Sequence, residues 1–130
     1  MSKALSPYGD FHDARFVGVE YSSDDRVVLS FKLVNGARKE VVLEKVRFIR
    51  ICDFIWQNVV SRLFDSNFEG INSSVFLDNK VEWLYALSDG TPLINDKAMD
   101  EIKMGIRDGS FRLFCLEPSW GAELVCLCDR

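Results

Sequence analysis

The feature that most constrains the fold is a two-residue alternation of apolar and polar side chains in the stretch 26–33. The apolar members of this alternation are Val27, Leu29, Phe31 and Leu33. A period of two is the signature of a β-strand with one buried face. A second strand is predicted at 15–21, because Val17, Val19 and Tyr21 share one face there.

Two turns are expected to divide the stretch from Ala14 to Ile51 into a meander of three strands. Residues 22–25 (Ser-Ser-Asp-Asp) predict the first turn, because short polar side chains bond their own backbone. Asn35 and Gly36 predict a hairpin, since both residues tolerate positive φ.

The register of this hairpin can be predicted from the apolar pattern. A three-residue loop, 35–37, pairs Phe31 with Val41 and keeps the apolar faces together, whereas a two-residue loop pairs Phe31 with Glu40. Beyond Val41 the apolar phase jumps, which predicts a β-bulge near residues 44–45 that bends the strand.

The rest of the chain is expected to complete and cover this sheet. Segment 51–57 is interpreted as short helical or irregular cover. Further strands are predicted at 58–63, 75–77, 80–88, 110–117 and 122–129, with a turn at 118–121.

One amphipathic helix is predicted at about residues 96–108. Asn95 or Asp96 is a good N-cap, and Gly109 suits the left-handed residue that ends a helix. The expected fold class is α+β, mostly antiparallel β, with a bent sheet of about six or seven strands covered by this helix. We expect a single domain over residues 1–130, of which 1–10 form a loose lead-in.

Charge and composition narrow the classes of partner. A formal net charge of −4 disfavours nucleic acid, whose phosphates require a basic face, and suits a partner with a basic surface. The first ten residues do not resemble a signal peptide, and no apolar run approaches the ~20 residues that cross a bilayer. We therefore expect a cytoplasmic protein without membrane contact.

Four cysteines are expected to be reduced, buried thiols. They are Cys52, Cys115, Cys126 and Cys128. Their spacing lacks the close pairs of a zinc site, and we expect no metal or cofactor. Cys126 and Cys128 should share one face of the last strand.

His12 is the only histidine, and it precedes Asp13. A His-Asp pair could serve in acid–base chemistry, yet adjacent residues of an extended chain point in opposite directions unless the backbone twists locally. We interpret His12 and Asp13 as residues that fasten the start of the sheet.

Three segments of the chain form a distinctive pattern. Residues 11–14 (Phe-His-Asp-Ala) run into the strand at 15–20. The helix end 106–109 leads into 111–114 (Phe-Arg-Leu-Phe), and 117–124 reads Glu-Pro-Ser-Trp-Gly-Ala-Glu-Leu. This pattern, which covers residues 8–128, resembles small bacterial immunity proteins of polymorphic-toxin and contact-dependent inhibition systems, in the group with an N-terminal His-Asp-Ala motif.

The resemblance implies a non-catalytic protein that binds the C-terminal domain of a cognate toxin in the cytoplasm and neutralises it. It implies no contact residues. Candidates chosen because they are acidic or aromatic near predicted turns and edges are Asp24, Asp25, Glu82, Asp89 and Trp120. The alternatives are a small ligand-binding domain or enzyme that uses His12, and an assembly module that pairs through a sheet edge.

Overall fold

The computed structural model describes residues 7–68 and 74–130, and within them the α+β prediction is confirmed. In this described part of the chain, seven antiparallel strands form one sheet in the order β3-β2-β1-β5-β6-β7-β4. The elements are η1 (Gly9–Phe11), β1 (Arg15–Ser22), β2 (Arg26–Lys32), β3 (Arg38–Leu43), β4 (Val46–Cys52), β5 (Val59–Asp65), α1 (Ser74–Leu84), α2 (Asp96–Asp108), β6 (Phe111–Trp120) and β7 (Glu123–Asp129).

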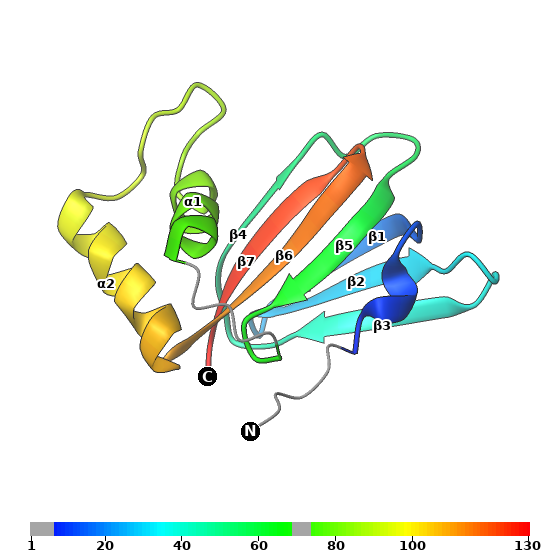
Figure 1. Ribbon diagram of the computed structural model, residues 1–130, viewed down its shortest axis with the longest axis horizontal. Coiled ribbons are helices and arrows are strands. Elements are labelled where there is room, and N and C mark those ends of the chain that lie inside the picture. The colour runs from blue at the N-terminus through cyan, green and yellow to red at the C-terminus, as the bar shows by residue number, and fades with distance from the viewer. Residues whose placement is uncertain (1–6, 69–73) are drawn as a thin grey trace.

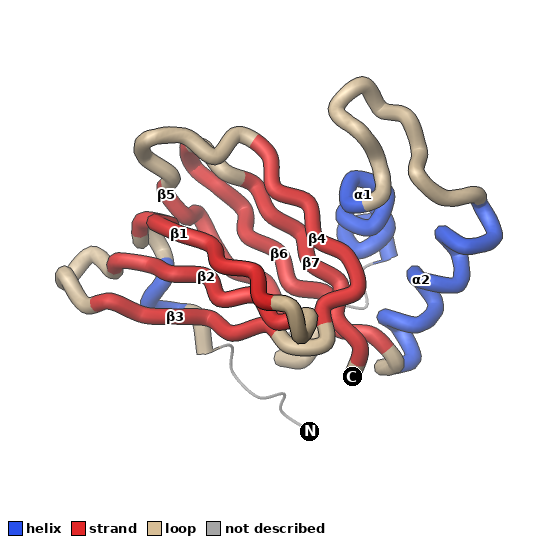
Figure 2. The backbone as a smooth tube through the Cα atoms, turned by 180° about the vertical axis from the view of Figure 1, so that it is seen from behind, coloured by secondary structure: helices blue, strands red, loops and turns tan. Residues whose placement is uncertain are grey.

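The sheet bends into two layers, β1–β2–β3 and β5–β6–β7–β4. The register between β1 and β5 contains a single residue pair, Arg15 opposite Val59, so the two layers diverge beyond that point. Figure 1 shows both helices beside β4, β7 and β6, and Figure 2 shows the β1–β2–β3 layer set apart from the helices.

The predicted bulge at 44–45 is wrong, because the chain does not continue as one strand. β3 ends at Leu43 and β4 begins at Val46, and these two strands lie at opposite ends of the strand order. Lys45, with a φ of 55°, lies in the turn between β3 and β4, and the Val46 amide donates a hydrogen bond to the carbonyl of Asp25 (2.9 Å). The jump in apolar phase therefore marks a strand break.

Two apolar cores lie on the two faces of the β5–β6–β7–β4 layer. The inner core lies between the layers and includes Leu29, Leu43, Phe114 and Leu124. The outer core lies under the helices and includes Phe64, Leu77, Val81, Leu113 and Val125. The sheet is thus buried on both sides where the helices cover it.

The two cysteines of strand β7 lie on the same face of the strand, as expected. Cys126 and Cys128 face the inner core, with their sulfur atoms 3.8 Å apart, and Leu127 faces the outer core. Cys115 is also buried, which raises the pKa of its thiol, whereas Cys52 is only partly buried. All four are free thiols in the structure.

The β2–β3 hairpin has a three-residue loop, but its register differs from the prediction by two residues. Leu29 pairs with Val41, and the Leu33 amide donates to the Ala37 carbonyl (2.8 Å), so the loop is 34–36. Gly36, at φ 89°, occupies the left-handed third position that this loop type requires. A shift of two residues keeps the apolar faces, which is why the sequence pattern could not detect it.

The strands predicted at 75–77 and 80–88 are wrong, because this region forms α1. Leu77, Val81 and Leu84 follow one another at spacings of four and three residues, and all three are buried in the outer core. The last strands are confirmed, although β6 runs through the predicted turn to Trp120 and the chain reverses at Gly121.

Helix α2 matches its prediction at both ends. The Asn95 side chain accepts a hydrogen bond from the Ala98 amide (2.8 Å), and Gly109, at φ 88°, ends the helix. Gly105 lies against the Phe111 ring, and a Cβ there would come within 2.5 Å of a ring carbon. This glycine lets the helix pack closely against the start of β6.

Asp65 of β5 forms a buried ion pair with Arg112 of β6, and Tyr8 of the N-terminal segment hydrogen-bonds to it. Asp65 is fully buried and accepts hydrogen bonds from the Arg112 guanidinium and from the Tyr8 hydroxyl (3.0 Å). Burial and the Asp65 charge raise the pKa of Tyr8 to about 12. Residues 1–6 of the predicted lead-in lie outside the described residues.

Candidate functional site

The first two acidic candidates lie in the turn between β1 and β2. Asp24 accepts from the Ser22 hydroxyl, which holds the pKa of its carboxyl below the usual value, and Asp25 accepts from the Tyr21 hydroxyl (3.0 Å). Both side chains are exposed. Their local hydrogen bonds stabilise the turn and leave their charges on the surface.

The other two acidic candidates lie on the helical side of the molecule. Glu82 of α1 forms an ion pair with Lys103 of α2 (3.0 Å), which joins the two helices. Asp89 accepts from the Thr91 amide (2.9 Å) in the loop after α1, and hydrogen bonding by the Thr91 side chain and then by its backbone lowers the pKa of the Asp89 carboxyl. Each therefore has a local structural partner.

His12 and Asp13 lie at the surface where the chain enters β1. His12 Nδ1 is 2.8 Å from the carbonyl oxygen of Ser61 in β5. Because a carbonyl oxygen only accepts, Nδ1 carries the proton and donates the hydrogen bond. Asp13 has a φ of 63°, which supplies the local twist and brings its carboxylate within 3.6 Å of His12 Nε2. The His12 side chain is 70% exposed, so solvent surrounds this pair.

Trp120, the aromatic candidate, ends β6 opposite Val59 and is 64% exposed. Near this end of the sheet lies a second set of exposed apolar side chains that the sequence reasoning assigned to cover: Phe54, Ile55 and Trp56 of the β4–β5 loop. Trp56 is 95% exposed, the largest value among the exposed apolar side chains of the described residues.

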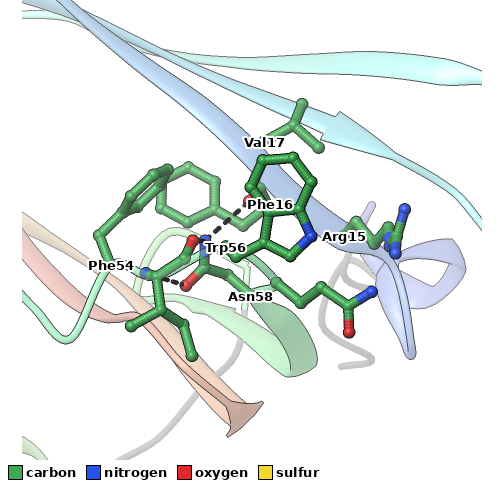
Figure 3. A pocket seen from close by; sticks show the side chains of 8 residues that line it. Arg15, Phe16, Val17, Phe54, Trp56 and Asn58 are labelled. Carbon is green, nitrogen blue, oxygen red and sulfur yellow. Dashed lines mark hydrogen bonds between the residues drawn. The ribbon is translucent and has the colours of Figure 1, made fainter.

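The loop that carries Trp56 is held by one buried polar side chain, Asn58. Its Oδ1 accepts from the amides of Ile55 and Ala122 (both 3.0 Å). Its Nδ2 donates to the carbonyls of Ile55 (2.9 Å) and Phe16 (3.3 Å), as Figure 3 shows in part. Asn58 thus joins the loop to β1 and to the turn before β7.

The turn before β7 fits closely against the loop. Gly121 has a φ of 83°, and a Cβ at this position would lie 2.5 Å from Asn58 Oδ1 and 2.9 Å from the Gln57 carbonyl. Only glycine combines this conformation with this approach. The exposed Trp56 therefore stands on a loop that neighbouring elements fix in place.

A small hollow of about 280 Å³ lies beside Trp56. Its walls are formed by two segments, 15–17 of β1 and 54–58 of the loop. Phe54 packs edge-to-face against buried Phe16, with ring centroids 5.3 Å apart, and Arg15 supplies a cationic donor to the lining (Figure 3). The lining is suited to an apolar side chain and offers no carboxylate or imidazole.

Nothing in the described ranges 7–68 and 74–130 groups three or more histidine, cysteine or acidic side chains as a metal site would. In those same ranges no helix is both long and apolar enough to cross a membrane. Comparisons of the chain with protein-family models, with curated proteins and with solved structures found no significant match.

Proposed function

We propose that this protein is a non-catalytic immunity protein that binds the C-terminal domain of a cognate bacterial toxin and neutralises it. The observation that supports binding most strongly is Trp56, which is 95% exposed on a loop fixed by buried Asn58. The resemblance of residues 8–128 to immunity proteins supplies the class of partner.

The energetics favour Trp56 as an anchor for another protein. Tryptophan is enriched among interface residues whose truncation costs about 2 kcal/mol or more. A side chain on a fixed loop loses less conformational freedom on binding than one on a mobile loop. Trp120, 64% exposed at the end of β6, offers a second aromatic ring at the end of the sheet.

The charge of the chain supports a basic partner. The formal net charge is −4, and exposed carboxylates such as Asp24 and Asp25 lie on the β1–β2 turn. Complementary charge accelerates association and disfavours wrong partners. A toxin domain with a basic substrate-binding cleft fits this balance.

Co-expression tests the proposal. The C-terminal domain of the polypeptide encoded immediately upstream is produced with and without this protein, and growth and pull-down are measured together. We expect a complex and restored growth. Absence of both would contradict the proposal.

The His12→Ala variant distinguishes the alternative of a small ligand-binding domain or enzyme that uses His12. An immunity protein should retain both complex formation and protection, because His12 contributes a single exposed hydrogen bond to Ser61. Loss of protection with the complex intact would instead favour the alternative.

A further inference from the structure

Strand β1 has a free edge over most of its length. It pairs with β2 from Arg15 to Ser22, but with β5 only at Arg15. The last backbone contact on the β5 side is the Phe16 amide donating to the Asn58 carbonyl (2.8 Å). Beyond it, within the described residues, no backbone hydrogen bond joins residues 17–22 to the β4–β5 loop, and this part of β1 has a strand neighbour on one side only.

A bulge gives this free edge apolar side chains. The register of β1 on β2 shifts between Phe16 and Gly18, so that Val19 lies opposite Leu29 and Tyr21 opposite Val27. Leu29 and Val27 are buried in the inner core, yet Val19 is 42% and Tyr21 60% exposed. The side chains of Val19 and Tyr21 therefore lie on the same face of the sheet as the inner core, but solvent reaches them. Val17, Val19 and Tyr21 are called the β1 strip below.

The β1 strip lacks the charged side chains that protect the edge strand β3. Strand β3 begins with three exposed charged residues, Arg38, Lys39 and Glu40. Charged side chains on an edge oppose the addition of another strand. Between residues 17 and 21 the only charged residue is Glu20. A free, β-branched edge of this kind is suited to pairing with an extended segment.

The charges around the strip define the segment that fits it. Arg15 lies at the start of β1 and lines the hollow beside Trp56. Glu20, Asp24 and Asp25 are exposed at the other end. A complementary segment has apolar side chains in its middle and lysine or arginine where it reaches the β1–β2 turn.

We infer that the toxin domain docks by adding an extended segment of this chemistry to the free edge of β1. Its apolar side chains cover the β1 strip, its basic residues lie at Asp24 and Asp25, and Trp56 contacts it beside the start of the strand. The inference rests on the proposed function and adds the mode of binding to it.

Hydrogen exchange of the full chain, alone and with the C-terminal domain of the upstream polypeptide, tests the inference directly. Those amides of residues 17–22 that point away from β2 should exchange at least about tenfold more slowly in the complex, because hydrogen-bonded amides exchange only on opening. The amides of the β2–β3 loop, 34–36, should not change.

Matched substitutions give a second readout. Asp24→Lys should weaken binding at least about tenfold, mostly through slower association, whereas Asp89→Lys should leave binding unchanged. Both residues are exposed turn carboxylates with a local hydrogen bond, so their effects on folding are comparable. Val19→Lys, with Val34→Lys as its control, tests the strip in the same way.

The outcomes separate the inference from the proposed function. A complex that forms without slower exchange at 17–22, and that tolerates Asp24→Lys and Val19→Lys, would overturn strand addition while the immunity function stands. Failure of the two proteins to associate at all would overturn both.

Discussion

The Asn58→Ala substitution tests the claim that a single buried side chain holds the aromatic loop. Asn58 is 3% exposed and makes four hydrogen bonds, two as acceptor and two as donor. Alanine cannot replace any of them. The change therefore leaves the amides of Ile55 and Ala122 without their acceptor and the carbonyls of Phe16 and Ile55 without a donor.

The magnitude follows from these four groups. The buried Ala122 amide costs about 1–3 kcal/mol when it loses its acceptor, and each of the other three lost hydrogen bonds, of which the two at Ile55 are only partly buried, costs about 0.5–1 kcal/mol. The sum is about 3–5 kcal/mol, a large share of the roughly 5–15 kcal/mol that stabilises a domain of this size. The loop should also become mobile, so the affinity for a protein that contacts Trp56 should fall.

Urea denaturation followed by circular dichroism measures this loss. With a slope of about 2 kcal/mol per molar urea, the midpoint should fall by about 2 M at unchanged slope. Gln57→Ala, an exposed change in the same loop, is the control and should stay within about 0.5 kcal/mol. A loss below about 1 kcal/mol for Asn58→Ala, or an equal loss for the control, would refute the reasoning.

Three further changes test other parts of the structure. Gly105→Ala should lower Tm, because its Cβ would lie 2.5 Å from the Phe111 ring, whereas helix propensity alone predicts a gain of about 1 kcal/mol. Gly121→Ala should lower stability by about 2 kcal/mol or more, since φ is 83° and the Cβ would meet a loop carbonyl; an unchanged urea midpoint would contradict this. The raised pKa of Tyr8, about 12 against an ordinary 10.0, means that its stabilising effect is complete below pH 10 and is lost as pH rises towards 12. Tyr8→Phe should therefore flatten the decline of unfolding free energy in that range.

Local patterns sufficed to predict some elements. The alternation at 26–33 correctly predicted β2, and the N-cap at Asn95 together with the glycine at 109 correctly predicted both ends of α2. These signals depend on neighbours in the sequence. For this reason they survive without knowledge of the rest of the fold.

Helix α1 could not be distinguished from a strand in this way. Val81, Trp83, Tyr85 and Leu87 alternate like a strand, while Leu77, Val81 and Leu84 recur like a helix. Leu87 proves to be exposed, and the helical set is buried. Packing against the outer face of the sheet decides between the two patterns, and that face is assembled from strands far away in the sequence.

Local sequence patterns also could not predict the position of the candidate site. Asn58 bonds to Phe16 and Ala122, which are 42 and 64 residues away. Nothing in its neighbourhood marks it as buried. The run 54–56 (Phe-Ile-Trp) was visible, yet apolar residues are buried more often than exposed, and this run was assigned to cover. The four acids were chosen because they are acidic and lie near predicted turns and edges, and all four proved to have structural partners.

The most direct test of the account is the affinity of the Trp56→Ala variant for the C-terminal domain of the upstream polypeptide, measured by isothermal titration calorimetry. Because Trp56 is 95% exposed, the variant should fold with an unchanged Tm. The account predicts that Kd rises at least about 30-fold, which corresponds to the 2 kcal/mol of an anchor residue. A wild-type complex whose Kd is unchanged by Trp56→Ala would contradict it.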